Sequence, residues 1–291
     1  MNDKKSVAII MRSKDEMPYT EKVFEMLSAQ TWQDYCVYNV DSGSTDGTMD
    51  CVRRHNFQEE HIFQIPPEEY IPGRVLNFMI SKVHEPIVVL LNADAIPQDE
   101  KWLEALIQPL LDGKAEGALS RQVPRSDALF IVKEDYRRAY DPKRFSRGTL
   151  DDFFSAVSCA FKRSIWEETP FREEGYSEDL AWFRACREKG HRFLYVPESV
   201  VEHSHNYSLR GLYKKRFRHG VTFSEIYARP PKGFKCVWCA SKEMARDFLT
   251  ALSRGQLQTI PYNVLYRGVI YWAYHQGQKE GAEQIKKKER V

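Results

Sequence analysis

A short polar segment that follows a strongly apolar run has the residue types to do chemistry. Residues 87–91 read Ile-Val-Val-Leu-Leu, and Asn92, Ala93 and Asp94 come directly after them. Five apolar residues in a row are typical of a strand that is buried on both faces of a parallel sheet. Ligands of open α/β sheets bind beyond the carboxyl ends of the strands. Asp94 is therefore a candidate contact for a metal ion or a phosphate group.

A second polar segment, residues 41–48, reads Asp-Ser-Gly-Ser-Thr-Asp-Gly-Thr. Its hydroxyls and carboxylates follow another predicted strand, which favours a nucleoside or a sugar as the ligand. The Gly-Lys-Ser/Thr ending of a Walker phosphate loop does not occur in it. The same residues would also suit a turn and a helix cap without any ligand.

A third group of candidate residues lies before predicted helices. Residues 173–179 contain four carboxylates directly ahead of a helix that carries Leu180 and Trp182. Acids at such a position can simply interact with the helix dipole, so this interpretation stays open beside a catalytic one. Arg74 also precedes a helix, and from there its guanidinium could reach a diphosphate.

Alternating strands and helices must position these residues. Strands are predicted at residues 6–11, 35–40, 61–65, 87–91, 151–161 and 192–196. Helices are predicted between them, among them Asp99–Leu111 with Trp102 and Leu106 on one face. With short loops, a βαβα alternation requires a parallel sheet.

Length and composition exclude several classes of protein. The chain has 291 residues, of which 42% are hydrophobic and 29% charged, as in an ordinary globular protein of one large or two modest domains. No apolar run reaches the roughly 18 to 20 residues that span a bilayer. Residues 1–5 lead into a predicted strand instead of a signal peptide, so we expect a cytoplasmic protein.

Six scattered cysteines fit a reducing compartment better than a disulfide framework. Cys236 and Cys239 have the spacing of a zinc or redox pair, but the sequence holds no second pair. We therefore predict two buried thiols on a helix.

Charge is divided unevenly along the chain. Residues 205–291 contain 17 Lys and Arg against 6 Asp and Glu, a net charge of +11, whereas residues 1–204 carry −9. Such asymmetry indicates a polyanionic partner for the basic end, either nucleic acid or an anionic membrane surface.

Together these segments resemble the family 2 glycosyltransferases, inverting enzymes of the GT-A fold that take a sugar from a nucleotide diphosphate. The resemblance rests on the order of residues 40–48, then 92–94, then Glu178-Asp179, then His203, and it covers roughly residues 6–205. It implies an α/β fold, a Rossmann-like, mostly parallel sheet flanked by helices, for residues 1–204. Residues 205–291 would form a basic helical region that packs on this catalytic domain and contacts a membrane or a second subunit.

A narrower resemblance is to bacterial rhamnosyltransferases of O-antigen and exopolysaccharide assembly. It is carried by residues 94–97, 120–125, 153–155, 178–179 and 201–207. It implies dTDP-L-rhamnose as the donor and a glycan or polyprenyl-diphosphate-linked acceptor. A UDP- or GDP-sugar is the alternative donor, because the same framework hosts many sugars.

The resemblance also implies roles on the donor side. The implied nucleotide-binding residues are Arg12, Glu16, Asp41, Ser42, Ser44, Asp46, Arg74, Asn92 and Ala93. Among them, Asp41 would read the base, Arg12 and Glu16 would face the nucleotide from the first loop, and Arg74 would hold the diphosphate.

Asp94 resembles the last acid of the Asp-x-Asp motif that binds Mg²⁺ or Mn²⁺ in this family. Asn92 replaces the first acid, which removes one charge from the site. His203 or His205 would complete the coordination, although either could instead form hydrogen bonds within the sheet. If one strand carries both histidines, their rings point to the same face.

On the acceptor side, Asp179 matches the general base of the family's Glu-Asp motif. Glu178, Arg121 and Gln122 would bind the acceptor. Direct inversion needs such a base, which typically contributes about 10²–10⁴-fold to the rate.

The basic end then has a candidate purpose. Residues 209–217 and 262–274 have apolar and aromatic residues at helical spacing, with Lys and Arg between them. This pattern suits an anionic bilayer that carries the acceptor, or else helices that pack on the catalytic domain or on a second copy in a homodimer.

Two other functions fit the sequence less well than glycosyl transfer. A nucleotidyltransferase usually has a glycine-rich first loop, and residues 12–16 contain no glycine. A nucleic-acid-binding protein would use the basic end, but no recognised nucleic-acid motif accompanies the charge, so no nucleic-acid partner is expected.

Overall fold

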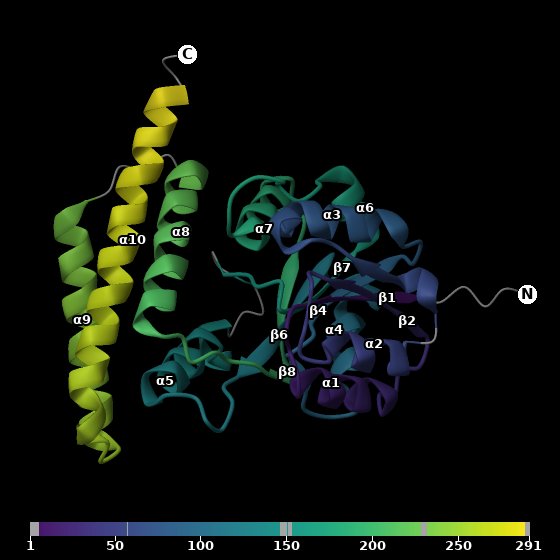
Figure 1. Ribbon diagram of the computed structural model, residues 1–291, viewed down its shortest axis with the longest axis horizontal. Coiled ribbons are helices and arrows are strands. Elements are labelled where there is room, and N and C mark those ends of the chain that lie inside the picture. Colours follow the sequence, from purple (N-terminus) through teal and green to yellow (C-terminus); the bar gives the residue numbers. More distant parts are fainter. Residues whose placement is uncertain (1–5, 57, 146–149, 151–152, 228–231, 289–291) are drawn as a thin grey trace, which may run out of the picture. The chain divides into compact units, whose positions relative to one another are not determined.

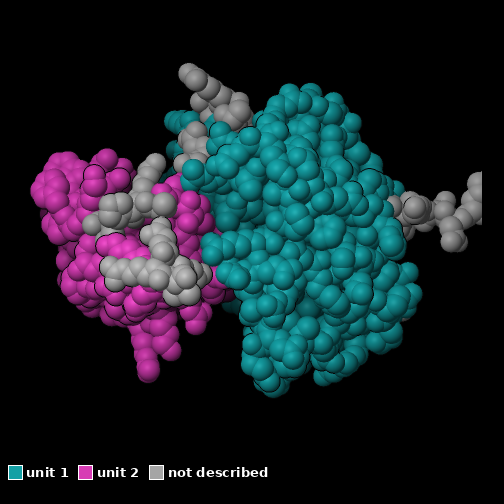
Figure 2. Space-filling view, turned by 90° about the horizontal axis from the view of Figure 1, so that it is seen from above, with its two compact units in different colours: residues 1–125, 136–174, 178–204 teal, residues 126–135, 175–177, 205–291 magenta. Residues whose placement is uncertain are grey.

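The computed structural model describes residues 6–56, 58–145, 150, 153–227 and 232–288. The chain divides into two compact units (Figure 2). The first unit comprises Met1–Arg125, Tyr136–Glu174 and Glu178–Ser204. The second comprises Ser126–Asp135, Gly175–Ser177 and His205–Val291, so it takes in two short segments that the sequence assigned to the first domain.

A single sheet runs through the described part of the first unit, in the order β3-β2-β1-β4-β7-β6-β8-β5. Its strands are β1 (Val7–Ser13), β2 (Tyr35–Asp41), β3 (Ile62–Gln64), β4 (Ile87–Asn92), β5 (Ile96–Pro97), β6 (Gly117–Val123), β7 (Ser158–Lys162) and β8 (Phe193–Glu202). Neighbours from β3 to β4 are parallel, β7 is antiparallel to both β4 and β6, and β6 is parallel to β8. The predicted α/β class, with a mostly parallel sheet, is confirmed.

Helices cover both faces of this sheet (Figure 1). On one face lie α1 (Tyr19–Ser28), α2 (Thr48–His55) and α4 (Trp102–Leu111), and on the other lie α3 (Pro72–Lys82), α6 (Arg163–Glu168) and α7 (Glu178–Glu188). The helix α5 (Phe130–Ala139) begins in the second unit and ends in the first. Successive residues of β1 alternate between the two cores: Val7 and Ile9 pack on the first face, Ala8 and Ile10 on the second.

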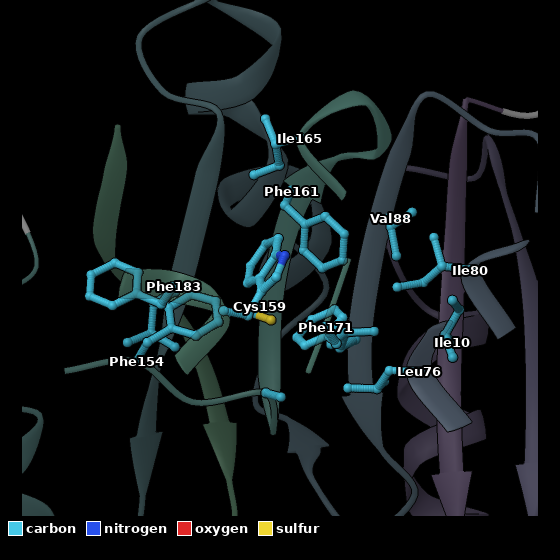
Figure 3. Close-up of a cluster of buried hydrophobic side chains, with 14 of the residues drawn as sticks. Ile10, Leu76, Ile80, Val88, Phe154, Cys159, Phe161, Ile165, Phe171 and Phe183 are labelled. Atoms are coloured by element: carbon cyan, nitrogen blue, oxygen red, sulfur yellow. The ribbon is translucent and has the colours of Figure 1, made fainter. Parts of the chain in front are cut away.

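The strand predicted at residues 151–161 is only partly correct. Residues 151 and 152 lie outside the described residues, and β7 begins at Ser158. Before it, Phe154 stacks on Phe183 with ring centroids 5.1 Å apart, in the aromatic core of Figure 3. An aromatic side chain can thus be buried from a loop, which the apolar run alone does not distinguish from a strand.

The same core fixes the beginning of α7. Trp182 is 1% exposed and stacks on Phe171 at 4.7 Å, while its Nε1 donates a hydrogen bond to Thr169 O at 2.6 Å. Burying an aromatic side chain of this size stabilises the fold by about 1.5–3 kcal/mol. Trp182 therefore anchors α7 one turn after Glu178 and Asp179, the two acids at its beginning.

Three long helices make up most of the second unit: α8 (Leu209–Tyr227), α9 (Gly233–Ser253) and α10 (Ile260–Lys288). The helix predicted at residues 262–274 lies within α10. Cys236 and Cys239 lie on α9, as predicted, but they are half-buried free thiols instead of buried ones. Among the described helices, none has both the length and the apolarity to cross a bilayer.

Ion pairs fix the interior of the second unit. Arg267 on α10 donates from Nε to Asp247 Oδ2 at 2.6 Å and from Nη1 to Asp135 Oδ2 at 3.0 Å. Arg254 donates to Glu134 Oε1 at 2.6 Å. The buried members of these pairs, Arg267, Asp247 and Glu134, are all hydrogen-bonded to a charged partner, as buried charges must be.

Candidate functional site

Polar residues at the carboxyl ends of β1, β2 and β4 lie together. The register pairs Arg12 with Asn92 across β1 and β4, and Ser13 with Asp41 across β1 and β2. Parallel neighbours end at the same edge of a sheet, which is where α/β proteins bind ligands. The N–H of Ala93 donates to Arg12 O at 3.1 Å, which fixes the turn after β4.

Asp41 is fully buried and organises the loop after β2. Its Oδ1 accepts hydrogen bonds from the backbone N–H groups of Gly43 at 2.9 Å and Ser44 at 2.8 Å, and its Oδ2 accepts one from Ser13 Oγ at 2.9 Å. Gly43 has a φ of 84°, a conformation that favours glycine. Ser42 donates to Ser13 O at 3.4 Å. The turn predicted for this segment is present, and a role of Asp41 in reading a base stays a prediction.

The loop after β1 is hydrogen-bonded to the loop after β2. Backbone N–H groups of Asp15, Glu16 and Met17 donate to Ser44 Oγ at 2.8 Å, Thr48 Oγ1 at 2.9 Å and Asp46 Oδ2 at 2.9 Å, respectively. In the other direction, the N–H of Thr45 donates to Asp15 Oδ1 at 2.7 Å. Two segments thirty residues apart therefore form one wall at the sheet edge.

Arg12 links two predicted parts of the site. It lies within β1, not in the following loop where the sequence placed it. Its Nη2 donates to Asn92 Oδ1 at 3.0 Å, and its Nη1 lies 3.4 Å from Glu178 Oε1. A single, partly buried guanidinium therefore spans the distance between the end of β4 and the beginning of α7.

Asp94 is 1% exposed, and two basic side chains meet its carboxylate. Arg125 Nη2 donates to Asp94 Oδ2 at 2.9 Å and to Asp94 O at 2.6 Å. His203 Nε2 lies 3.6 Å from the same Oδ2. The guanidinium of Arg125 also stacks on the ring of Tyr19, with its carbon 3.6 Å from the ring centroid. The predicted metal ligand is thus one half of a buried ion pair.

His203 is oriented from the far side of its ring. Its Nδ1 lies 3.1 Å from Gln122 Oε1 and 3.2 Å from Tyr136 Oη. A proton on Nδ1, donated to Gln122, leaves the lone pair of Nε2 directed at Asp94, which is the arrangement of many metal-binding histidines. Asp94 and His203 therefore fit two positions of a divalent cation.

The second predicted histidine ligand, His205, follows the end of β8 instead of lying on the strand. Strand β8 ends at Glu202, so His203 and His205 do not lie on one strand, and the argument from strand alternation is wrong. His205 is the first residue of its segment in the second unit, where its ring packs on Tyr207 with centroids 5.4 Å apart. Its role as a ligand stays a prediction.

The acid pair stands at the start of α7, after Ser177, whose φ of 60° is unusual for a residue with a side chain. Asp179 Oδ2 accepts the N–H of Ala156 at 3.2 Å, and Oδ1 accepts the N–H of Leu180 at 2.8 Å. Burial raises the pKa of Asp179. Burial and the charge of Asp179 together raise the pKa of Glu178 to about 7, against the effect of Arg12.

Glu16 contributes a third carboxyl group with a raised pKa. Burial and the negative charge of Asp94 raise the pKa of Glu16 to about 8, although Arg125 opposes the shift. Perturbed carboxyl groups that gather at one edge of a sheet are typical of functional sites.

The remaining predicted residues lie around this centre. Arg121 and Gln122, on β6, line a cavity of about 120 Å³ together with Tyr136 and Tyr140. Arg74 lies in the first turn of α3, and its exposed Nε is 3.9 Å from Glu173 Oε2.

Two residues of the centre had no predicted role. Arg125 belongs to a segment that the sequence resemblance used, but nothing in the sequence pairs it with Asp94, 31 residues away. Tyr136 lies on α5, where an aromatic residue at helical spacing is most simply a core residue. Only the fold brings both to Asp94 and His203.

Known proteins resemble this chain in sequence and in fold. The family model described as Glycosyl transferase family 2 matches residues 8–169. The O-antigen chain rhamnosyltransferase RfbN of Salmonella typhimurium is 26% identical over 210 residues, and WbaN of Salmonella anatum is 27% identical over 209. Each alignment covers 68% of this chain, but only 66% and 65% of the two relatives.

Solved structures share the fold at low sequence identity. The mannosyltransferase PcManGT from Pyrobaculum calidifontis, in complex with GDP-Man and Mn²⁺, has a TM-score of 0.59 at 19% identity and covers 98% of this chain and 79% of its own. Glucosyl-3-phosphoglycerate synthase from Mycobacterium tuberculosis, in complex with Mn²⁺ and UDP, has a TM-score of 0.56 at 18% identity and covers 79% of this chain and 82% of its own. The fold is that of the GT-A glycosyltransferases. Because the family model spans more than half of the chain, the protein belongs to glycosyl transferase family 2.

Proposed function

We propose that the protein is an inverting glycosyltransferase that moves a sugar from a nucleotide diphosphate to a glycan or lipid-linked acceptor. The observation that carries the proposal is the bridge made by Arg12, which contacts Asn92, two residues from Asp94, and Glu178, the neighbour of Asp179. Direct inversion needs stabilisation of the leaving diphosphate and a base for the attacking hydroxyl. The candidate groups for stabilising the diphosphate and for the base lie on two sides of the Arg12 guanidinium.

The donor that we favour is dTDP-L-rhamnose, in the assembly of a cell-surface polysaccharide such as an O-antigen. The support is that two relatives at 26% and 27% identity are named O-antigen chain rhamnosyltransferases. A UDP- or GDP-sugar is the alternative, since neighbours of the same fold were solved with GDP-Man and with UDP.

Mg²⁺ or Mn²⁺ would supply positive charge at the diphosphate as it leaves. We propose that Asp94, His203 and His205 hold the ion. Asn92 contributes no charge, and Arg125 already interacts with Asp94, so the nucleotide would have to provide further oxygen ligands.

The nucleotide would lie along the wall formed by the loops after β1 and β2. There Asp41, held by the turn and supported by Ser42, Ser44 and Asp46, would contact the base. Glu16, Arg12, Asn92 and Ala93 would face the nucleotide from the strand ends. Arg74 is exposed and would reach toward the phosphates from the first turn of α3.

On the acceptor side, Asp179 would remove the proton from the attacking hydroxyl. Its raised pKa makes its carboxylate a stronger base than an exposed aspartate, and two backbone N–H groups hold its oxygens in place. Glu178, Arg121 and Gln122 would bind the acceptor. The predicted location, in the cytoplasm at the inner face of the cell membrane, belongs to this proposal.

A donor panel tests the proposed function without an identified acceptor. The protein is incubated with dTDP-rhamnose, UDP-glucose or GDP-mannose in Mg²⁺ or Mn²⁺, and release of the nucleotide diphosphate is followed by chromatography. We expect slow hydrolysis of one donor, which Asp94→Asn reduces and the exposed control Asp112→Asn does not. If no donor is hydrolysed and no nucleotide diphosphate raises the melting temperature, the proposal is wrong.

A further inference from the structure

The helix α9 exposes large apolar side chains near both of its ends. Phe234 is 85% exposed, Val237 65%, Trp238 63% and Leu249 63%. Phe248 and Leu252 are also exposed, at 48% and 53%. We call Phe234, Val237, Trp238, Phe248, Leu249 and Leu252 the α9 stripe. Singly exposed apolar residues are ordinary, but six of them grouped on one helix mark an interaction surface.

Helix geometry places the stripe on one face. Its members recur at intervals of three, four and eleven residues, and such intervals lie on one side of a helix. At 1.5 Å per residue, the distance from Phe234 to Leu252 is about 27 Å. Ser241 and Ala245, which are small and exposed, lie between the two clusters on the same side.

The opposite side of α9 is held inside the second unit. Asp247 and Ala251 are buried, and Asp247 forms its ion pair with Arg267 of the neighbouring α10 (Figure 1). This contact fixes the rotation of α9 about its axis. The stripe is thus exposed because of how the helix packs.

Positive charges run beside the stripe. Lys235, Lys242 and Arg246 are exposed, and their spacing of seven and four residues puts them along one edge of it. Of the two acids on α9, Glu243 pairs with Arg246 at 3.0 Å and so neutralises that cation, whereas Asp247 is buried and pairs with Arg267. Among the described residues, neither of these acids is paired with Lys235 or Lys242, so these two lysines carry the charge of the edge. Residues 205–291 carry a net charge of +11.

We propose that the α9 stripe binds the surface of an anionic lipid bilayer, with its aromatic side chains in the headgroup region and its lysines at the lipid phosphates. Aromatic and aliphatic residues on one face with basic residues beside them are the features of helices that lie in a membrane interface. The charge argues against a second copy of the chain as the occupant, because two segments of +11 would meet.

Vesicle flotation tests the proposal on the full chain and needs no sugar donor, so its outcome is independent of the proposed transferase activity. At low salt, we expect the protein to float with vesicles of phosphatidylglycerol and phosphatidylcholine, but not with phosphatidylcholine alone. Phe234→Ser with Trp238→Ser should reduce the bound fraction roughly tenfold or more, and Lys235→Glu with Lys242→Glu should abolish the preference for anionic lipid. The control Leu111→Ser, an exposed leucine at the end of α4, should bind like wild type.

Two results would overturn the proposal. The first is a wild-type protein that does not float with anionic vesicles at low salt, or a variant with Phe234→Ser and Trp238→Ser that floats as well as the wild type. The other is a dimer in analytical ultracentrifugation that Phe234→Ser with Trp238→Ser dissociates, because the stripe would then be a contact between two copies. Circular dichroism and melting curves establish that each variant is folded, which the exposure of these residues leads us to expect.

Discussion

The guanidinium of Arg125 lies 2.9 Å from the carboxylate of Asp94, and both side chains are buried. In the protein as described, the acid that should hold a metal ion is already neutralised by an arginine of the same chain. Removing one partner of a buried ion pair typically costs about 3–5 kcal/mol, so a cation that takes the place of Arg125 has to compensate for that loss. The diphosphate of the nucleotide can do so, because it offers oxygen ligands to the metal and an anionic partner to the arginine.

We therefore expect weak binding of Mn²⁺ to the free protein and tighter binding once UDP or dTDP is present. Arg125→Gln should strengthen binding to the free protein, since Asp94 then lacks its cation, whereas Arg53→Gln, an exposed control on α2, should not. Isothermal titration calorimetry with and without nucleotide measures both effects. Tight binding of Mn²⁺ to the wild-type protein alone would contradict the expectation.

Asp179→Asn should lower turnover by about 10²–10⁴-fold and leave donor binding unchanged, because it removes the proposed base and keeps the shape. Its matched control is Glu188→Gln, an exposed residue at the other end of α7. Steady-state kinetics with the donor identified by the panel separate kcat from KM. Turnover of Asp179→Asn within about threefold of wild type would exclude Asp179 as the base.

The positions of these residues divide into those that the sequence predicts and those that it does not. The apolar run Ile87–Leu91 predicts a buried strand, and a strand of that kind predicts that Asp94 stands at a sheet edge. Local pattern also predicts the turn at Asp41, because an aspartate before glycine and serine readily bonds to their backbone N–H groups. The hydrogen bonds of this turn join residues that are close in the sequence, so the local sequence is enough to predict them.

Contacts across the sheet are different in kind. Arg12 meets Glu178 over a separation of 166 residues, and Arg125 meets Asp94 only because β5, α4 and β6 bring the chain back. The solvent exposure of the α9 stripe also cannot be predicted from the sequence. Its apolar residues have the periodicity of a core helix, and only the packing of Asp247 shows that they face outward. Periodicity gives the face of a helix and not what covers it.

A stability prediction follows from Glu178, whose pKa is raised from 4.5 to about 7. Between these values the folded protein binds more protons than the unfolded chain, so this group lowers the free energy of unfolding as the pH rises through that window. Glu178→Gln removes the titration. Its stability relative to wild type should therefore increase from about pH 4.5 to about pH 7 and stay constant above. Urea unfolding at several pH values measures this difference in stability. If the stability of wild type and variant changed with pH in the same way, the pKa of Glu178 would not be raised.

The last prediction concerns the helix pair in the second unit. A Cβ atom on Gly277 of α10 would overlap with Phe217 O of α8, and backbone atoms cannot yield as a flexible side chain can. Gly277→Ala must therefore separate α8 from α10, at a cost of about 1–3 kcal/mol, as is typical of overpacking. Gly268→Ala in the same helix has no atom within 4 Å of its new Cβ and should stabilise the helix by up to about 1 kcal/mol. Thermal unfolding with hydrogen exchange distinguishes the two: a lower melting temperature with faster exchange in α8 is expected for Gly277→Ala alone. Equal effects of the two substitutions would show that helix propensity, and not close packing, explains the glycine at 277.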